Sequence, residues 1–256
     1  MLHFSWERIW KNPLKNVVIC FLLLFPSLEI VLYLRNSGLG IGGKVYNPDF
    51  AFFLGGNIAQ YEHFFQAIYL WLMPIYCLVV VAEDCIEDFT TGYSNILITK
   101  FGKKSYIRGN LTKGFLISFL TILCAMVINL VLVHLLFQDG HFSPYGDICY
   151  AEGVERWGIE HPLLANLAFS IVTSFFCGMI SMVGVISVLI FHSRKVAYGI
   201  TILAWLAPVI CKNSLMLVFQ PRSEYSLETL AMIAVTVLIP YGLYIVIGYY
   251  KEVRFE

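Results

Sequence analysis

Residues 163–191 read LLANLAFSIVTSFFCGMISMVGVISVLIF and contain no Asp, Glu, Lys or Arg. A helix needs about 20 consecutive apolar residues to cross a bilayer. Because this run is longer, it predicts a transmembrane helix that tilts or extends beyond the membrane. Small residues recur along the run at near-helical spacing and predict close packing against another helix: Ser170, Ser174, Gly178, Ser181 and Gly184.

The composition of the whole chain favours a membrane protein. Of 256 residues, 59% are hydrophobic and 13% are charged, whereas soluble domains average about 45–50% and about 25%. We therefore predict an all-α integral membrane protein with one transmembrane domain, residues 1–256. The net charge of zero gives no indication of nucleic-acid binding, and none is expected. Six spans are predicted, at about residues 17–34, 64–82, 114–137, 163–191, 196–218 and 230–250.

The distribution of Lys and Arg predicts the orientation of these spans. With the N-terminus inside, the inside segments hold twelve of the 17 Lys and Arg residues and the outside segments hold five. Both termini are therefore expected in the cytoplasm, and the chain in the plasma (inner) membrane. Residues 1–13 mix aromatic and charged side chains, which predicts a short interfacial helix; the alternative is an ordinary charged leader. A tight turn at His192–Lys195 separates the fourth and fifth spans.

The segment 83–113 lies between the second and third spans and divides into two halves. In the first half, apolar residues recur at helical spacing and predict one amphipathic helix parallel to the membrane: Ile86, Phe89, Tyr93, Ile96 and Leu97. The second half, KFGKKSYIRGNLTKG, is basic and is expected to be a turn-rich return to the membrane. Its GKKS resembles the end of a phosphate-binding loop, but Leu97 occupies the position where that loop requires glycine.

This segment resembles the corresponding part of bacterial ABC-2 transporter permease subunits. In that family an acidic residue, a Thr-Gly pair, apolar residues, a basic turn and a Tyr precede a Lys at the third span. The matching positions here are Glu87, Thr91, Gly92, Ile96, Leu97, Lys103, Lys104, Tyr106 and Lys113. The chain departs from the commoner pattern by having four acids before the glycine and two extra lysines.

The resemblance implies that the segment is a coupling helix that docks in a groove of a separate ATPase subunit. It also implies a second permease chain, identical or homologous, with ATP and Mg on the ATPase and no cofactor on this chain. The alternative is a solvated loop that carries positive-inside charges. The expected coupling residues are Ile86, Glu87, Phe89, Thr91, Gly92, Tyr93, Ile96, Leu97, Lys103, Lys104 and Tyr106.

Four acids, Glu83, Asp84, Glu87 and Asp88, begin this segment. They suggest a metal or catalytic site, but no histidine accompanies them. We therefore interpret them as structural or partner-docking acids, whose mutual repulsion Arg108, Lys113 or a basic partner surface offsets.

Two polar residues inside the spans are candidates for a translocation path. Ionisable residues within a membrane are costly and indicate function by default. Glu29 lies near the outer end of its span, where its carboxylate is able to snorkel toward water. Asn129 lies deeper and is expected to make an interhelical hydrogen bond. Pro208 and Pro240 are expected to kink the last two spans.

Enzyme motifs are missing from the sequence, and the seven cysteines form no CxxC pair. We expect no catalytic residue and no metal site. The function expected from the resemblance is export of an amphipathic or hydrophobic cargo, such as a peptide, bacteriocin or antibiotic. The alternatives are an intramembrane enzyme, for which only Glu29 and Asn129 are available, and a non-transporting membrane scaffold or sensor.

Overall fold

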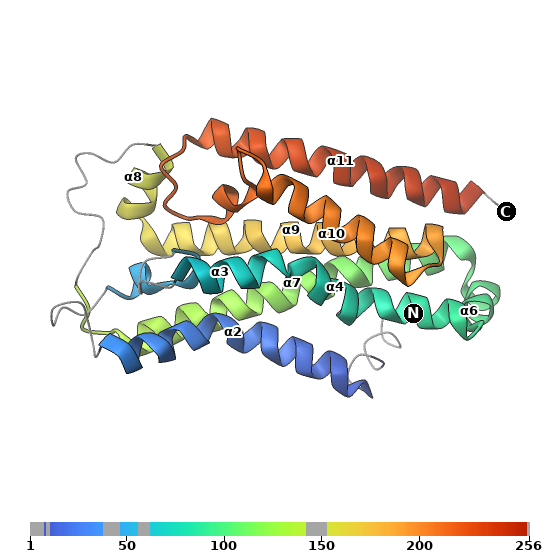
Figure 1. The fold of residues 1–256 in the computed structure, drawn as a ribbon, viewed down its shortest axis with the longest axis horizontal. Helices are drawn as coiled ribbons and strands as arrows, with labels where there is room; N and C mark the ends of the chain where they lie inside the picture. Colours follow the sequence, from blue (N-terminus) through green and yellow to red (C-terminus); the bar gives the residue numbers. More distant parts are fainter. Residues whose placement is uncertain (1–7, 9–10, 38–46, 56–61, 142–152, 255–256) are drawn as a thin grey trace.

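The computed structural model describes residues 8, 11–37, 47–55, 62–141 and 153–254, which form a bundle of helices along one long axis (Figure 1). No strand occurs among these residues. The α-helices are α2 Pro13–Ser37, α3 Glu62–Trp71, α4 Met73–Cys77, α5 Glu83–Thr90, α6 Tyr93–Phe101, α7 Lys103–Leu136, α8 Gly153–Glu160, α9 Pro162–Phe191, α10 Arg194–Ile210 and α11 Leu227–Arg254. The shorter elements are the 3-10 turns η1 Pro48–Ala51, η2 Phe53–Gly55 and η5 Leu215–Phe219, and the π-helical turn η3 Leu78–Ala82.

Four helices of the described chain are long and apolar enough to cross a membrane: α2 over Pro13–Val31, α7, α9 and α11. A fifth crossing is formed if α3 and the helix that follows it, which meet at a bend of 42°, are counted as one broken span. The predicted class, an all-α membrane protein with several spans, is supported at this level. The start of α2, the turn between α9 and α10, helix α6 and the end of α11 lie at the same end of the bundle (Figure 1).

Two predicted boundaries were wrong, while the predicted span 64–82 coincides with α3–η3. Within it the chain bends at Leu72, where Pro74 interrupts the backbone hydrogen bonds. The span 196–218 ends early, because α10 stops at Ile210. The third helix begins at Lys103 rather than near 114, so the basic return is helical and not turn-rich.

Two other predictions were more accurate. The run 163–191 coincides with α9, and a turn of two residues, His192 and Ser193, leads into α10. His192 has a left-handed backbone, with φ of 49°. The predicted interfacial helix 1–13 lies almost entirely outside the described residues.

Helix α9 is the centre of the bundle and packs against α7, α10, α11 and α4. Its small residues allow these close contacts, as predicted. A Cβ atom added at Gly178 would lie 2.7 Å from the ring of Phe115 on α7, and one at Gly184 would lie 2.8 Å from Leu78. The serines of the stripe, Ser170, Ser174 and Ser181, are buried.

Prolines at three interhelical contacts each leave a backbone carbonyl without its helical donor, because proline has no N–H for the carbonyl four residues earlier. An aromatic side chain from another helix donates to each of these carbonyls. Tyr69 Oη donates to Leu22 O (3.0 Å, before Pro26), Trp205 Nε1 to Leu70 O (2.8 Å, before Pro74), and Tyr241 Oη to Ala204 O (2.8 Å, before Pro208). These bonds satisfy the carbonyls and fix the helices against one another.

Substitution of Tyr69 by Phe tests this arrangement. The variant leaves the Leu22 carbonyl unpaired in a buried position, so we expect the free energy of unfolding to fall by about 1–3 kcal/mol. Thermal denaturation of the purified chain in detergent measures the change. The matched control is Tyr76→Phe, since Tyr76 is half-buried and its hydroxyl makes no hydrogen bond among the described residues. Equal losses in the two variants would contradict the assignment.

Candidate functional site

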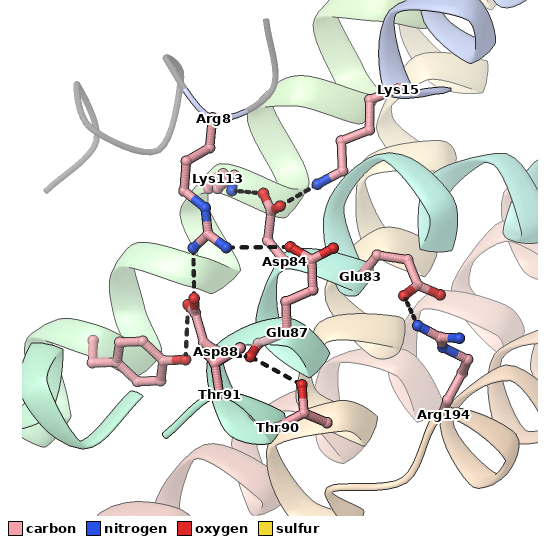
Figure 2. A network of polar contacts seen from close by, with 11 residues as sticks. Arg8, Lys15, Glu83, Asp84, Glu87, Asp88, Thr90, Thr91, Lys113 and Arg194 are labelled. Carbon is pink, nitrogen blue, oxygen red and sulfur yellow. Dashed lines mark hydrogen bonds and ion pairs between the residues drawn. The ribbon is translucent and has the colours of Figure 1, made fainter. Parts of the chain in front are cut away.

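The most extensive polar network of the described chain surrounds α5, at the end of the bundle that also carries α6 (Figures 1 and 2). At its centre the Asp84 carboxylate accepts one bond from Lys15 Nζ on α2 and another from Lys113 Nζ on α7. All three side chains are buried, and Asp84 is only 3% exposed. This carboxylate therefore joins three helices at one point.

Asp84 follows the apolar run that ends at Ala82. Burial alone would raise the pKa of its carboxyl, but Lys113 and Lys15 hold that pKa below its usual value. The carboxylate is thus kept ionised, as two cations beside it require. Neutralising Asp84 would leave both buried lysines without a counter-charge, whereas removing one lysine would leave the other paired with Asp84.

The other three acids of α5 are also paired (Figure 2). Asp88 accepts from Arg8 Nη1 at 2.5 Å, while Arg8 Nη2 lies 3.4 Å from the half-exposed carboxylate of Glu87. Burial nevertheless raises the pKa of the Asp88 carboxyl. Glu83 accepts from two groups of α10, Arg194 Nη2 at 2.6 Å and Tyr198 Oη at 2.8 Å.

Four acids are therefore matched by four cations, Arg8, Lys15, Lys113 and Arg194. The prediction that these acids are structural is supported by these contacts. Lys113 offsets their charge as predicted. Arg108 does not, because it is exposed and joins no ion pair among the described residues.

The predicted single helix across Ile86–Leu97 is wrong. Helix α5 ends at Thr90 and α6 begins at Tyr93. Between them the Thr91 hydroxyl donates to the Glu87 carbonyl at 2.7 Å, and Gly92 takes a left-handed backbone with φ of 71°. A residue with a Cβ adopts that conformation at a cost, so glycine fits this break.

Most side chains of the predicted apolar stripe are covered by other parts of the same chain. Ile86 and Leu97 are buried, and the half-buried ring of Phe89 meets the His192 ring edge-on, with centroids 4.2 Å apart. The Arg8 guanidinium lies over the aromatic ring of Tyr93, with its Cζ 6.0 Å from the ring centroid. Ile96 is the exception within the stripe, with 61% of its surface exposed.

The basic half of the segment forms the first turns of α7. Gly102, with φ of 80°, separates it from α6. Tyr106 is buried and its hydroxyl donates to Asp88 at 3.4 Å. Lys103 Nζ lies 3.9 Å from the Glu252 carboxylate near the end of α11, whereas Lys104 is exposed.

An exposed surface remains at the outermost part of α6 and the start of α7. We call it the α6 tip, and it comprises Ile96, Lys100, Phe101, Lys104 and Arg108. Phe101 is 41% exposed and was not among the predicted coupling residues. The signal that could have identified it is its place at the end of a helix, directly before a glycine. The α6 tip thus combines two exposed apolar side chains with three cations.

The two candidate path residues have different environments. Asn129 uses both amide atoms: Nδ2 donates to the Pro26 carbonyl at 2.9 Å, and Oδ1 accepts from the backbone N–H of Phe53 at 3.0 Å. This confirms the interhelical hydrogen bond. Glu29 is buried within α2, with no hydrogen bond or ion pair among the described residues, so its carboxylate does not reach the surface as snorkelling would require. Its place in a translocation path stays a prediction.

The opposite end of the bundle is closed by η1 and η2, whose residues 50–54 are buried. The Asp49 carbonyl accepts from Asn166 Nδ2 and from Arg222 Nη2, each at 2.8 Å. Gln66 Nε2 donates to the Leu54 carbonyl at 3.3 Å. Within the described ranges no group of three or more His, Cys, Asp and Glu side chains is placed to hold a metal ion.

Comparisons with known proteins identify relatives of this chain by sequence. A family model described as "Protein of unknown function (DUF2705)" matches residues 31–248. The chain is 33% identical over 225 residues to the "Uncharacterized protein YybM" of Bacillus subtilis (strain 168), covering 87% of this chain and 86% of the relative. No solved structure matches significantly. The family match includes α5, α6 and the α6 tip but neither Arg8 nor Lys15.

The charge of Asp84 should be essential to stability. Asp84→Asn leaves Lys15 and Lys113 buried without a counter-charge, so we expect unfolding to become easier by about 3–5 kcal/mol. Unfolding of the purified chain in mixed micelles measures this change. Glu87→Gln is the matched control, because Glu87 is half-exposed and its pair should contribute no more than about 1 kcal/mol. An Asp84→Asn chain as stable as Glu87→Gln would refute the central role of this carboxylate.

Proposed function

The chain belongs to the DUF2705 family, and we propose that it is the permease subunit of a bacterial ATP-driven transporter of the ABC-2 type. In this proposal a separate ATPase subunit binds ATP and Mg, and the α6 tip docks on that subunit. The carrying observation is the construction of the α5–α6 unit, which presents an exposed surface beyond the apolar helices and is fixed to the bundle by buried ion pairs.

This construction suits the transmission of force. ATP-driven motion of a partner requires a rigid element that it can push. Asp84, Asp88 and Glu83 tie α5 to α2, to the residues before α2, to α7 and to α10. A displacement of α6 would therefore act on several helices together rather than bend a loose loop.

The α6 tip has the chemistry of a docking surface. Ile96 and Phe101 supply exposed apolar side chains, and three exposed cations, Lys100, Lys104 and Arg108, lie on the same two helices. Aromatic and aliphatic anchors inside a polar rim are typical of energetic centres in protein interfaces. We therefore place the coupling surface on the exposed side of α6 rather than on the buried stripe. The remaining expected coupling residues position α6 relative to α5 and α7: Thr91, Gly92, Tyr93, Lys103 and Tyr106.

The orientation proposed here places the α6 tip in the cytoplasm. The segments that carry the twelve Lys and Arg residues of the predicted inside set lie at the same end of the bundle (Figure 1). We propose six crossings, with α3–η3 as a broken span and α10 as the shortest. Its 17 residues are at the lower limit of about 17–25 for a span.

The cargo proposed is an amphipathic or hydrophobic molecule, such as a peptide, bacteriocin or antibiotic, that is exported. Few charged side chains within the spans favour such a cargo. A second permease chain would complete the path. Helices α2 and α11 have the surfaces for lipid or for that chain, because only 28% of each apolar window is buried.

Affinity purification from membranes of the native host tests the proposal. A tagged chain should bring down an ATP-binding-cassette ATPase, identified by mass spectrometry, and the complex should hydrolyse ATP. An isolated chain that yields no ATPase under mild cross-linking would favour an intramembrane enzyme or a scaffold instead.

The double variant Ile96→Ser, Phe101→Ser tests the docking surface. Removing both anchors should cost about 2 kcal/mol or more of binding free energy, as interface anchors do, and should remove most of the co-purified ATPase. Leu227→Ser is the control, since Leu227 is as exposed as Ile96 but starts α11 at the other end of the bundle (Figure 1). Retention of the ATPase by the double variant would contradict docking at the α6 tip.

A further inference from the structure

A pocket of about 430 Å³ lies between α10 and α11 and reaches Val183 on α9. Its walls include both prolines of these two helices, Pro208 and Pro240, together with Tyr241 and Tyr244. The volume falls within the roughly 300–1,000 Å³ of typical small-molecule sites. The two prolines that the sequence suggests as kinks thus meet around one apolar space.

The polar groups of the pocket are nearly all engaged in the protein. The Tyr241 hydroxyl donates to the Ala204 carbonyl that Pro208 leaves free. The Tyr244 hydroxyl shares a hydrogen bond of 2.9 Å with Ser187, and the Thr236 hydroxyl donates to the Met232 carbonyl at 2.7 Å. None of the lining residues is charged.

The Thr236 carbonyl differs from the other proline-freed carbonyls. Pro240 has no N–H to donate to it, as Pro26, Pro74 and Pro208 have none for Leu22, Leu70 and Ala204. Each of those three carbonyls receives an aromatic donor from another helix. No side chain of the described residues donates to the Thr236 carbonyl, and Thr236 lines the pocket.

We propose that this pocket binds a neutral amphiphile, an apolar molecule with one hydroxyl, and that the hydroxyl donates to the Thr236 carbonyl. The ligand thereby supplies the donor that Tyr69, Trp205 and Tyr241 supply at the other three prolines. An uncharged ligand is required because the pocket offers no counter-charge, and an unpaired charge in an apolar site is costly.

The ligand enters from the bilayer. Ala207, Thr236 and Pro240 are exposed along the outer side of α10 and α11, so the pocket opens laterally where lipid surrounds the bundle. A hydroxyl-bearing amphiphile already dissolved in the membrane reaches the site without crossing water. The inference concerns this chain alone and does not depend on an ATPase.

Protection of Cys211 tests the site, because this exposed cysteine lines the pocket. The full chain, with Cys20, Cys124 and Cys149 replaced by alanine, is placed in phosphatidylcholine nanodiscs. The rate at which N-ethylmaleimide modifies Cys211 is followed by mass spectrometry at increasing mole fractions of 1-dodecanol or of dodecyl methyl ether. The alcohol should half-protect Cys211 at a mole fraction about fivefold lower than the ether, the factor that one hydrogen bond contributes.

Two variants test whether the Thr236 carbonyl is the acceptor and whether the ligand occupies the pocket. Pro240→Ala restores an N–H for the Thr236 carbonyl, so the alcohol and the ether should then protect equally. Ala207→Phe fills the pocket and should abolish protection, whereas Ala231→Phe, at an exposed α11 position outside the pocket, should retain it. The protection in each variant is compared with its own rate without additive.

Equal protection by alcohol and ether in the unsubstituted pocket would overturn the proposal, as would no protection by either. Persistence of the difference in Pro240→Ala would also overturn it. If Ala207→Phe aggregates, the Pro240→Ala comparison decides alone. Because no ATPase is present, the result is independent of whether the chain co-purifies with one.

Discussion

One buried carboxylate organises the end of this bundle. Asp84 is the shared anion of Lys15 and Lys113, and neither cation has another acidic partner among the described residues. Helices in lipid gain little from the hydrophobic effect when they associate, so specific polar contacts carry much of the choice of partner. Two further ion pairs attach α5 to other parts of the chain: Arg8–Asp88 to the segment before α2, and Arg194–Glu83 to α10. Removing the central charge would therefore weaken the attachment of α5 to both α2 and α7.

The second constraint is that backbone carbonyls inside the membrane need hydrogen-bond donors. A carbonyl within an apolar environment needs a donor, and a proline four residues later removes the usual one. The donors here come from aromatic side chains, which combine a large apolar body with one polar group. Each bond joins two different helices: Tyr69 connects α3 to α2, Trp205 connects α10 to α3, and Tyr241 connects α11 to α10. The same prolines that weaken individual helices thereby specify how the helices pack.

The apolar runs could be predicted because length and composition suffice for a crossing, as with residues 163–191. The bend lies beside Pro74 and the end of α10 at Ile210 lies beside Pro208. The donors to the carbonyls of Leu70 and Ala204 come from other helices, which local sequence does not reveal. The residues 103–113 were interpreted as a return loop because they are basic, yet Tyr106, Ile107, Asn110 and Leu111 are buried at helical spacing. The acids of α5 were expected to be structural, but Lys15 is 69 residues from Asp84 in the chain, and no spacing rule connects them. The helical spacing of residues 86–97 predicted an apolar stripe, but it did not predict that the rest of the protein would bury most of that stripe.

Helix α6 lies between two glycines, Gly92 and Gly102, that both have positive φ. Apart from its chain neighbours, neither glycine has an atom within 4 Å of where a Cβ would be, so each is favoured by its backbone angle rather than by crowding. Helix α6 is consequently independent of the helical register of α5 before it and of α7 after it. The exposed side chains of α6 can therefore be changed without altering the residues of α5 that form the ion pairs, because the two helices are separated at Gly92.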